Sequence, residues 1–358
     1  MKKLTALIAA ALSCLFLFAA CSVHIDVSLS PNWQSSQTSM YDNNFYEQLT
    51  YSLSFSNSVE EGETGMRVLL DAENSSYTVT IEAVPSTTVD GTAYYNLYRL
   101  TTEYVVSAEY LYTDENGNTT SLVKFGGENG EPDRVVTETL FHSLDPNYEM
   151  QRLQPVRVTR TVLSHTPAAM GTVVSYFNYT VTTTYDAACD SATISFVDGW
   201  GELSDEERKV SDFVTKYSYS SELTVEELQK NYSVFDNSQL YFMARGLDFA
   251  STQTAHTVNV VGEAGARQMT LTCASIGTHR YQFYLDNMAV DADITAVEVT
   301  FALTGANSGS SQTVFFAQKA EGATNLYRNL PLLIQEPYDY NIGTMNLTLA
   351  SAFHTRQA

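Results

Sequence analysis

The sequence predicts a mainly β protein in which antiparallel strands form either one large curved sheet or two β-domains, with a short helical insert near residues 204–246. From residue 45 onward, apolar and polar residues alternate with a period of two, which places successive side chains on opposite faces of a strand. The 358-residue chain also contains 23 tyrosines and 17 phenylalanines, and aromatic side chains favour strands. Signals that start helices are concentrated between residues 204 and 246.

The N-terminus has the pattern of an export signal. Lys2 and Lys3 precede an uncharged apolar run over residues 4–20, and Cys21 follows directly. These residues resemble a bacterial lipoprotein signal peptide with its lipobox, although Phe18 stands where leucine is usual. The alternatives are ordinary cleavage before residue 21 and an uncleaved membrane anchor. The resemblance implies that Cys21 carries a diacylglycerol, and that the protein is extracytoplasmic, lipid-anchored to the bacterial cell membrane or the outer membrane.

Residues 22–44 are rich in serine, asparagine and glutamine and show no periodicity, so we expect a flexible tether. The alternation then predicts an N-terminal antiparallel β region over residues 45–203. The loop 114–118 is expected to form a hairpin turn in which Asn116-Gly117 supplies the positive φ angles, and the glycines at 126–130 form the next turn. The strands predicted in this region are 51–55, 77–82, 94–112, 120–125, 134–141, 156–163, 173–185 and 192–197.

Three helix-start signals fall in the region 204–246. Residues 204–207 and 224–227 match capping boxes, in which a hydroxyl and a carboxylate each satisfy a free backbone N–H. Residues 236–239 precede the helix-forming run 240–245, and Gly246 is placed to close it. We therefore expect two or three short helices.

A C-terminal antiparallel β region is expected over residues 247–358. Its clearest strand is 296–303, in which apolar residues occupy every second position, and residues 306–311 form the turn that follows. The strands predicted in this region are 256–261, 268–273, 281–285, 296–303, 312–317, 332–335 and 345–350.

Several elements between residues 230 and 352 occur in the same order in a known family. They are the short helix at 235–245, the strand pair around 257–273, the strand 296–303 and the run 329–334. This arrangement resembles the secreted bacterial β-proteins catalogued as domain of unknown function 3108. Phe315 or Phe316 replaces the tryptophan of that family, and Arg328 lies three residues before Pro331 instead of two. The resemblance implies an extracytoplasmic curved half-barrel, and it transfers no catalytic residue.

The acidic composition argues against nucleic acid as a partner. Removal of the signal takes two lysines, which leaves 17 lysines and arginines against 41 aspartates and glutamates and a formal charge of about −24. Phosphate binding requires clustered basic side chains. We therefore expect the membrane to be contacted through the N-terminal lipid, and the ligand to be a lipid, a glycan or a protein.

Two cysteines remain after Cys14 leaves with the signal and Cys21 is lipidated. Cys189 and Cys273 lie in an export compartment that can be oxidising, so they could form a disulfide that connects the middle of the chain to its last third. The alternative is a pair of buried thiols, since Cys273 falls in an alternating run where a small apolar residue is expected.

We predict no catalytic, cofactor-binding or metal-binding residues from the sequence. The six histidines lack zinc-binding spacing, and glycine-rich phosphate loops and the nucleophile elbow are absent. The cluster His142-Ser143-Leu144-Asp145 could orient a base, and the acids at 205–207 could act as a catalytic pair. A loop after a strand and the start of a helix commonly carry such residues without catalysis.

The leading functional hypothesis is therefore a non-enzymatic binding protein without a cofactor. Strands with one apolar face could form a groove that takes an apolar or lipid-like ligand. The alternative is a cell-surface module that binds a protein or a glycan through exposed aromatic residues.

Overall fold

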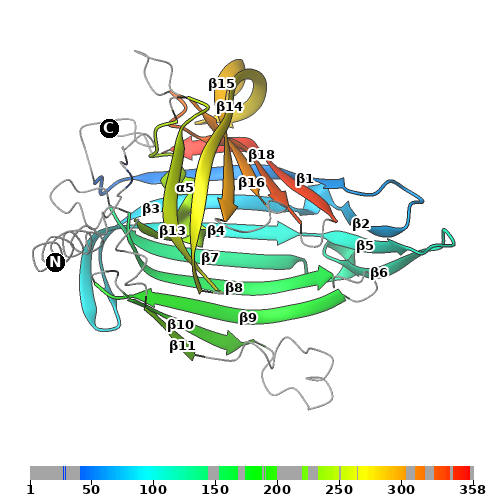
Figure 1. Cartoon of the computed structure of the whole chain (residues 1–358), viewed down its shortest axis with the longest axis horizontal. Coiled ribbons are helices and arrows are strands. Elements are labelled where there is room, and N and C mark those ends of the chain that lie inside the picture. Colours follow the sequence, from blue (N-terminus) through cyan, green and yellow to red (C-terminus); the bar gives the residue numbers. More distant parts are fainter. Residues whose placement is uncertain are drawn as a thin grey trace, which may run out of the picture.

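The computed structural model describes residues 27, 29, 41–143, 153–167, 174–187, 189, 191–199, 220–224, 233–249, 251–263, 265–303, 311–318, 326–338 and 342–354. In this part of the chain, fifteen strands form one large, mainly antiparallel curved sheet, and three more form a small sheet at one end (Figure 1). Both predicted β regions contribute to the large sheet. The prediction of a mainly β fold built on a large curved antiparallel sheet with a short helix is confirmed.

The first half of the large sheet comes from the predicted N-terminal β region, except for its edge strand over residues 220–224, which lies in the predicted helical insert. From the edge inward, its strands are β11 (Ser220–Thr224), β10 (Ser191–Asp198), β9 (Val174–Tyr185), β8 (Pro155–Pro167), β7 (Asp133–His142), β4 (Thr92–Val106), β3 (Ser76–Val89) and β1 (Tyr46–Asn57).

The second half comes from the predicted C-terminal β region and from residues 234–236 of the insert, and it begins where the first and last strands of the described residues pair. Its strands continue from β1 as β18 (Gly343–His354), β17 (Pro331–Pro337), β16 (Gln312–Ala317), β15 (Met288–Leu303), β14 (Gly265–Leu285), β13 (Ala255–Gly262) and β12 (Val234–Asp236). β1 and β18 are antiparallel and lie side by side at the middle of the sheet.

The second half crosses over one face of the first half, which we call the inner face. Figure 1 shows β13 and β14 running across β4, β7 and β8 at a steep angle. The turn η4 (Asn237–Gln239) and the helix α5 (Leu240–Ala244) lie on this side. Val158 and Val162 of β8 share a hydrophobic cluster with Val234 and Val261 of the second half, so apolar packing holds the two halves together.

A small sheet extends one end of the molecule. It consists of β2 (Gly65–Leu70), β5 (Ala108–Thr113) and β6 (Thr119–Phe125), flanked by the short 3₁₀ turns η1 (Ala72–Asn74) and η2 (Gly127–Asn129). Met66, Tyr110 and Phe125 are buried in the same cluster as the main core. The small sheet is therefore packed against the large one and shares its core.

Two strand predictions are wrong in extent. The stretch 94–112 is not one strand, because the chain leaves the large sheet at Ser107 and continues in the small one. The backbone N–H of Ser107 donates to the Ser75 hydroxyl, and its carbonyl accepts from Asp71, which replaces the sheet ladder at this point. Conversely, 268–273 and 281–285 belong to the single strand β14, which bends at an irregularity after Cys273.

The helical insert is smaller than predicted in the described residues. The helix start predicted at 236–239 is present, and it is a capping box in which the side chains of Asp236 and Gln239 both bond the backbone, followed by η4 and α5. Residues 220–224 form the edge strand β11, and 234–236 form β12. The signals at 204–207 and 225–227 lie outside the described residues.

The turn at 114–118 joins two strands as predicted, but its geometry differs. Only Gly117 has a positive φ, and Asp114 holds the loop instead by accepting hydrogen bonds from the backbone N–H groups of Asn116 and Asn118. Two-residue turns with both φ angles positive occur at Asp90-Gly91, between β3 and β4, and at Asp286-Asn287, between β14 and β15.

A buried ionic cluster connects three segments that are far apart in the chain. Both guanidinium Nη atoms of Arg245, after α5, bond the carboxylate of Glu47 on β1, and Nη2 lies 3.0 Å from Oε2. His354 at the end of β18 places Nε2 2.8 Å from the same Oε2. The carbonyl of Arg328 accepts a further bond from Arg245 at 2.9 Å. The side chains of Glu47, Arg245 and His354 are at most 2% exposed.

Parts of both terminal segments lie outside the described residues. The predicted signal peptide, including Cys21, lies outside the described residues. Within the predicted tether, Val27 and Tyr41 pack against the main core and Leu29 is buried in it. None of the helices in the described ranges has the length and apolar character needed to cross a bilayer.

Candidate binding site

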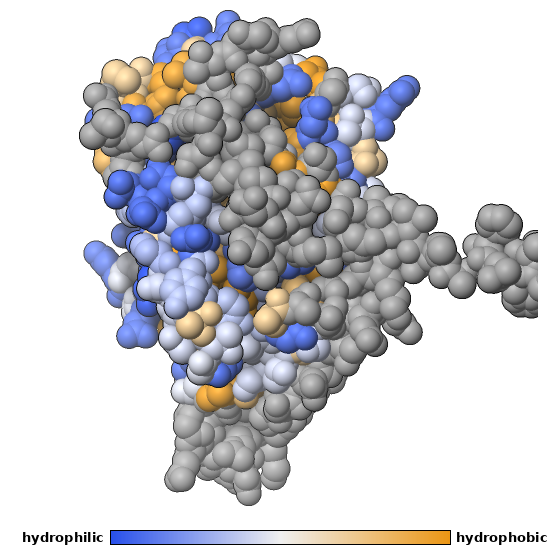
Figure 2. Space-filling model, turned by 90° about the vertical axis from the view of Figure 1, so that its left-hand side faces the viewer, coloured by the Kyte–Doolittle hydropathy of each residue, from blue (hydrophilic) through white to orange (hydrophobic). Residues whose placement is uncertain are grey.

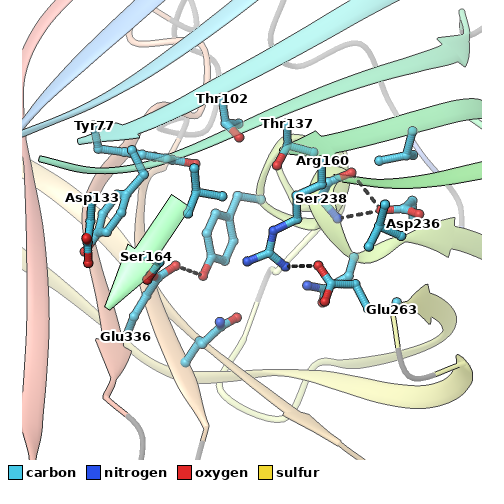
Figure 3. Close-up of a pocket in the computed structure, with 18 of the residues that line it drawn as sticks. Tyr77, Thr102, Asp133, Thr137, Arg160, Ser164, Asp236, Ser238, Glu263 and Glu336 are labelled. Carbon is cyan, nitrogen blue, oxygen red and sulfur yellow. Dashed lines mark hydrogen bonds and ion pairs between the residues drawn. The ribbon is translucent and has the colours of Figure 1, made fainter. Parts of the chain in front are cut away.

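A cavity of about 440 Å³ lies between the inner face and the segments that cross it. Strands β3, β4, β7, β8 and β9 form its floor. The turn η4, the helix α5, the end of β13 and the strands β16 and β17 form its roof. Figure 3 shows polar side chains from both sides pointing into it. The cavity therefore exists only because the sheet folds over itself.

The period-two alternation of the floor strands decides which side chains face the cavity. Every second residue lines it, while the intervening residues lie on the outer face of the sheet. The lining residues of the three central floor strands are 102, 104 and 106 of β4, 133, 135 and 137 of β7, and 158, 160, 164 and 166 of β8. Many of them are threonines, serines or charged residues, so the floor offers hydrogen-bonding groups as well as methyl groups.

The charges that line the cavity are strongly unequal. Four carboxylates, those of Asp133, Asp236, Glu263 and Glu336, face it together with one guanidinium, that of Arg160. Figure 3 shows Asp133 and Glu336 towards one end and Arg160, Asp236 and Glu263 towards the other. The two ends therefore differ in how far their acids are balanced by a basic group.

At one end, an ion pair bridges the floor and the roof. Arg160 Nη1 lies 2.8 Å from Glu263 Oε1, and the hydroxyl of Tyr179 donates to the other carboxylate oxygen at 3.2 Å. Both charged side chains remain more than a third exposed, so solvent screens the pair and its contribution to stability is small. Its main effect is to hold the loop after β13 above β8.

Asp236 lies near this ion pair and has all its hydrogen-bonding partners within the protein. The hydroxyl of Tyr185 donates to Oδ2 at 2.6 Å, and the backbone N–H and hydroxyl of Ser238 donate to Oδ1 at 2.9 and 2.7 Å. Burial raises the pKa of Asp236, although these hydrogen bonds oppose the increase. This carboxylate therefore serves to hold η4 against β9.

At the other end, both carboxylate oxygens of Asp133 are bonded to one residue, His165. Its Oδ1 lies 2.6 Å from Nδ1 of His165, and its Oδ2 accepts the backbone N–H of the same residue at 2.7 Å. The imidazole is stacked between the rings of Phe125 and Tyr176, with centroids at 4.5 and 4.1 Å. Burial raises the pKa of Asp133, against the effect of the neighbouring histidine.

Glu336 differs from the other three acids because it accepts a single hydrogen bond from the described residues, whereas each of the others has partners on both carboxylate oxygens. The hydroxyl of Tyr241 donates to Oε1 at 2.7 Å, and no basic side chain in the described residues forms an ion pair with this carboxylate. Burial raises the pKa of Glu336, although the bond from Tyr241 and the charge of Arg160 oppose the increase. Burial also raises the pKa of Tyr77 and Tyr104, and the charge of Glu336 adds to this effect.

Comparison with known proteins gives no relative to this chain. No protein-family model matches it, and neither a curated protein nor a solved structure does. A functional argument therefore depends on the chemistry of the cavity itself.

Of the candidate functional residues that the structure describes, His142, Ser143, Cys189 and Cys273, none lines this cavity. Cys189 and Cys273 are both buried thiols, and they belong to two separate hydrophobic clusters, so the disulfide alternative is not formed. His142 is half-buried at the end of β7, where burial lowers its pKa to about 4. Its predicted partner Asp145 and the acids at 205–207 lie outside the described residues.

Two of the residues that line the cavity could have been noticed in the sequence, because each is a charged residue in or next to an apolar strand pattern. Arg160 interrupts a series of valines at positions 156, 158 and 162, all on one face of β8. Glu336 similarly follows the apolar run 332–334. A charged residue in the inward register of an alternating strand is therefore the pattern that would have indicated the site. Within the described ranges, no group of three or more histidines, cysteines or acids is placed to hold a metal ion.

Proposed function

We propose that this protein is a lipid-anchored, non-enzymatic binding protein of the bacterial cell envelope, and that its ligand occupies the cavity over the inner face. The cavity supports this proposal because it is formed by many elements of one sheet and carries several hydrogen-bonding groups directed at its interior. The basic start, apolar run and Cys21 support the anchor.

The lining favours a ligand with polar or charged groups. Tyrosine, threonine and serine hydroxyls and four carboxylates face the cavity, and a fully apolar ligand would displace water from these groups without offering hydrogen bonds in its place. The lipid-like ligand expected from the sequence therefore fits best as an amphiphile, with its polar part among these groups. The half-barrel resemblance to domain of unknown function 3108 proteins remains a prediction.

A surface module for proteins or glycans is the second candidate. Tyr284 and Met288 are 58% and 60% exposed near the tip of the β14–β15 hairpin, which projects from the sheet (Figure 1). On the face seen in Figure 2, the described surface is mostly hydrophilic, and hydrophobic atoms form separate small patches. We therefore place this candidate second.

The anchor can be tested by replacing the proposed lipidation site. In a bacterial host grown with labelled palmitate, wild-type protein is expected to incorporate label and remain with the membranes. Cys21→Ala should lose both properties because it lacks the acceptor thiol. Cys14→Ala, which changes a cysteine inside the signal, is the matched control and should retain them. Equal labelling of all three proteins would contradict lipidation at Cys21.

The cavity can be tested with a variant that fills it. Thr102 of β4 lines the cavity, whereas Thr101 on the same strand faces the opposite side. Native mass spectrometry of full-length protein extracted from bacterial membranes should show a reproducible small-molecule adduct in the wild type and in Thr101→Trp. Thr102→Trp should lack the adduct because the indole occupies the space. A bare wild-type mass after reloading with envelope extract, or an adduct that persists in Thr102→Trp, would argue against the cavity as the binding site.

A further inference from the structure

Four tyrosines line the cavity together with Glu336, and three of them, Tyr77, Tyr104 and Tyr241, are close enough for its charge to raise their pKa. Tyr77 and Tyr104 come from the floor, Tyr241 from α5 and Tyr338 from the segment after β17, and all four line the cavity. We call them the tyrosine cluster. They come from widely separated parts of the chain, so the fold itself brings these rings to one carboxylate.

The tyrosine cluster is held in place by packing behind it. Tyr77 lies between the rings of Tyr51 and Tyr104, with centroids at 5.5 and 5.8 Å. Tyr241 packs edge-on against Phe301 at 5.5 Å. Tyr338 packs edge-on against Phe55, and its hydroxyl lies 2.5 Å from that of Tyr110. Rings fixed by such contacts lose little further freedom when a ligand binds.

The charge of Glu336 is not balanced by a neighbouring base. The nearest guanidinium that lines the cavity, that of Arg160, is paired with Glu263 at 2.8 Å. The bond from Tyr241 reaches only Oε1, so Oε2 accepts no hydrogen bond from a described residue. Burial of a carboxylate without an opposite charge is costly, and a cation bound beside it would remove that cost.

We propose that Glu336 and the tyrosine cluster form a subsite for an organic ammonium group. This inference rests on the proposed function and specifies the charge of the ligand. Aromatic rings attract a cation through their negative faces, and they do so most strongly where water is excluded. The carboxylate supplies the opposite charge, and a protonated amine can also donate to its unoccupied oxygen.

The experiment is a titration calorimetry series on full-length protein in detergent. The probes are choline, butylammonium and 3,3-dimethylbutan-1-ol, which has the shape of choline without its charge. Both cations should bind the wild type, and the neutral alcohol should bind at least about tenfold more weakly, because the charge contributes most of the affinity.

Two variants assign the binding to this subsite. Glu336→Gln keeps the shape of the side chain and removes its charge, and it should weaken cation binding by about tenfold or more. Tyr104→Leu removes one ring and should weaken it by about fivefold. Glu138→Gln makes the same charge change on the outer face of β7, where the side chain is exposed, and it should bind like the wild type. Circular dichroism identifies any variant that fails to fold.

Each outcome separates this inference from the proposed function. Absence of cation binding to the wild type, equal binding of the neutral alcohol, or unchanged affinity in Glu336→Gln would overturn the ammonium subsite. An envelope molecule that carries no cationic group and is lost from Thr102→Trp would also overturn it, while leaving the cavity as a binding site. Failure of both experiments would overturn both proposals.

Discussion

Replacing Glu47 with glutamine is expected to lower the free energy of unfolding by about 3–5 kcal/mol, because the change leaves the guanidinium of Arg245 buried without an opposite charge. The wild-type carboxylate is completely buried and bonds both Arg245 and His354. Glutamine preserves the volume of the side chain, so the effect isolates the loss of charge. It should appear as a lower midpoint in urea unfolding.

The same substitution should change how stability depends on pH. Burial alone would raise the pKa of Glu47, but the charge of Arg245 and the bonds from His354 and Arg245 lower it to about 2 from an ordinary value of 4.5. The folded state therefore binds this proton less tightly than the unfolded state. Its contribution, about 3 kcal/mol, is fully present above pH 4.5 and is lost as pH falls towards 2.

Wild type and Glu47→Gln should accordingly become more similar in stability as the pH falls from 5 to 2. Asp291→Asn is the matched control, because it breaks an ion pair with Arg280 that is exposed on the β14–β15 hairpin. That change should leave the urea midpoint almost unaltered. A Glu47→Gln protein as stable as the wild type at neutral pH would show that the buried cluster contributes nothing to stability.

Replacing Gly126 with alanine is expected to destabilise the protein by about 2–5 kcal/mol, since both the backbone and the available space exclude a side chain. Gly126 has φ 78° and ψ 170°, a conformation that only glycine adopts readily. A Cβ at this position would lie 2.0 Å from Oγ and 2.8 Å from Cα of Ser107. Ser107 is buried, and its backbone and hydroxyl are bonded to residues 71, 74 and 75, so it has little room to move.

Gly117→Ala provides the comparison for this prediction. Gly117 also has a positive φ, 81°, but no atom lies within 4 Å of the Cβ it would acquire. We expect a cost of about 1 kcal/mol there, from the backbone conformation alone. Urea unfolding of both variants measures the difference. Equal midpoints would mean that the close approach of Gly126 to Ser107 has no energetic consequence.

The alternation of residues predicted most of the fold, because it reports directly which face of a strand is buried. It located strands such as 134–141 and 312–317 within one or two residues of β7 and β16. It could not show that the chain changes sheets at Ser107, where the change depends on hydrogen bonds to a distant turn. Nor could it show that the two β regions form one sheet, because the pairing of β1 with β18 is a long-range contact.

The candidate site was predicted less well than the fold. Its carboxylates and rings come from many elements, so no local motif contains them. Glu336 and Tyr77 are more than 250 residues apart in the sequence, and only the crossing of the two halves of the sheet brings them to one cavity. A short pattern such as His142 to Asp145 can be recognised in a sequence because its residues are neighbours in the chain. The residues that line this cavity are neighbours only in the folded protein.

The central pairing of β1 with β18 also has a consequence for how the protein is made. A chain that leaves the ribosome N-terminus first presents β1 early and β18 almost 300 residues later. Every earlier fragment holds the two halves of the sheet without the strand that joins them, and the contact of Glu47 with His354 cannot form. Truncated or interrupted chains therefore expose two unpaired sheet edges. Such edges can pair with other chains, so we expect these fragments to aggregate or to be degraded by proteases. Only a chain that includes β18 can join the two halves of the sheet around the cavity.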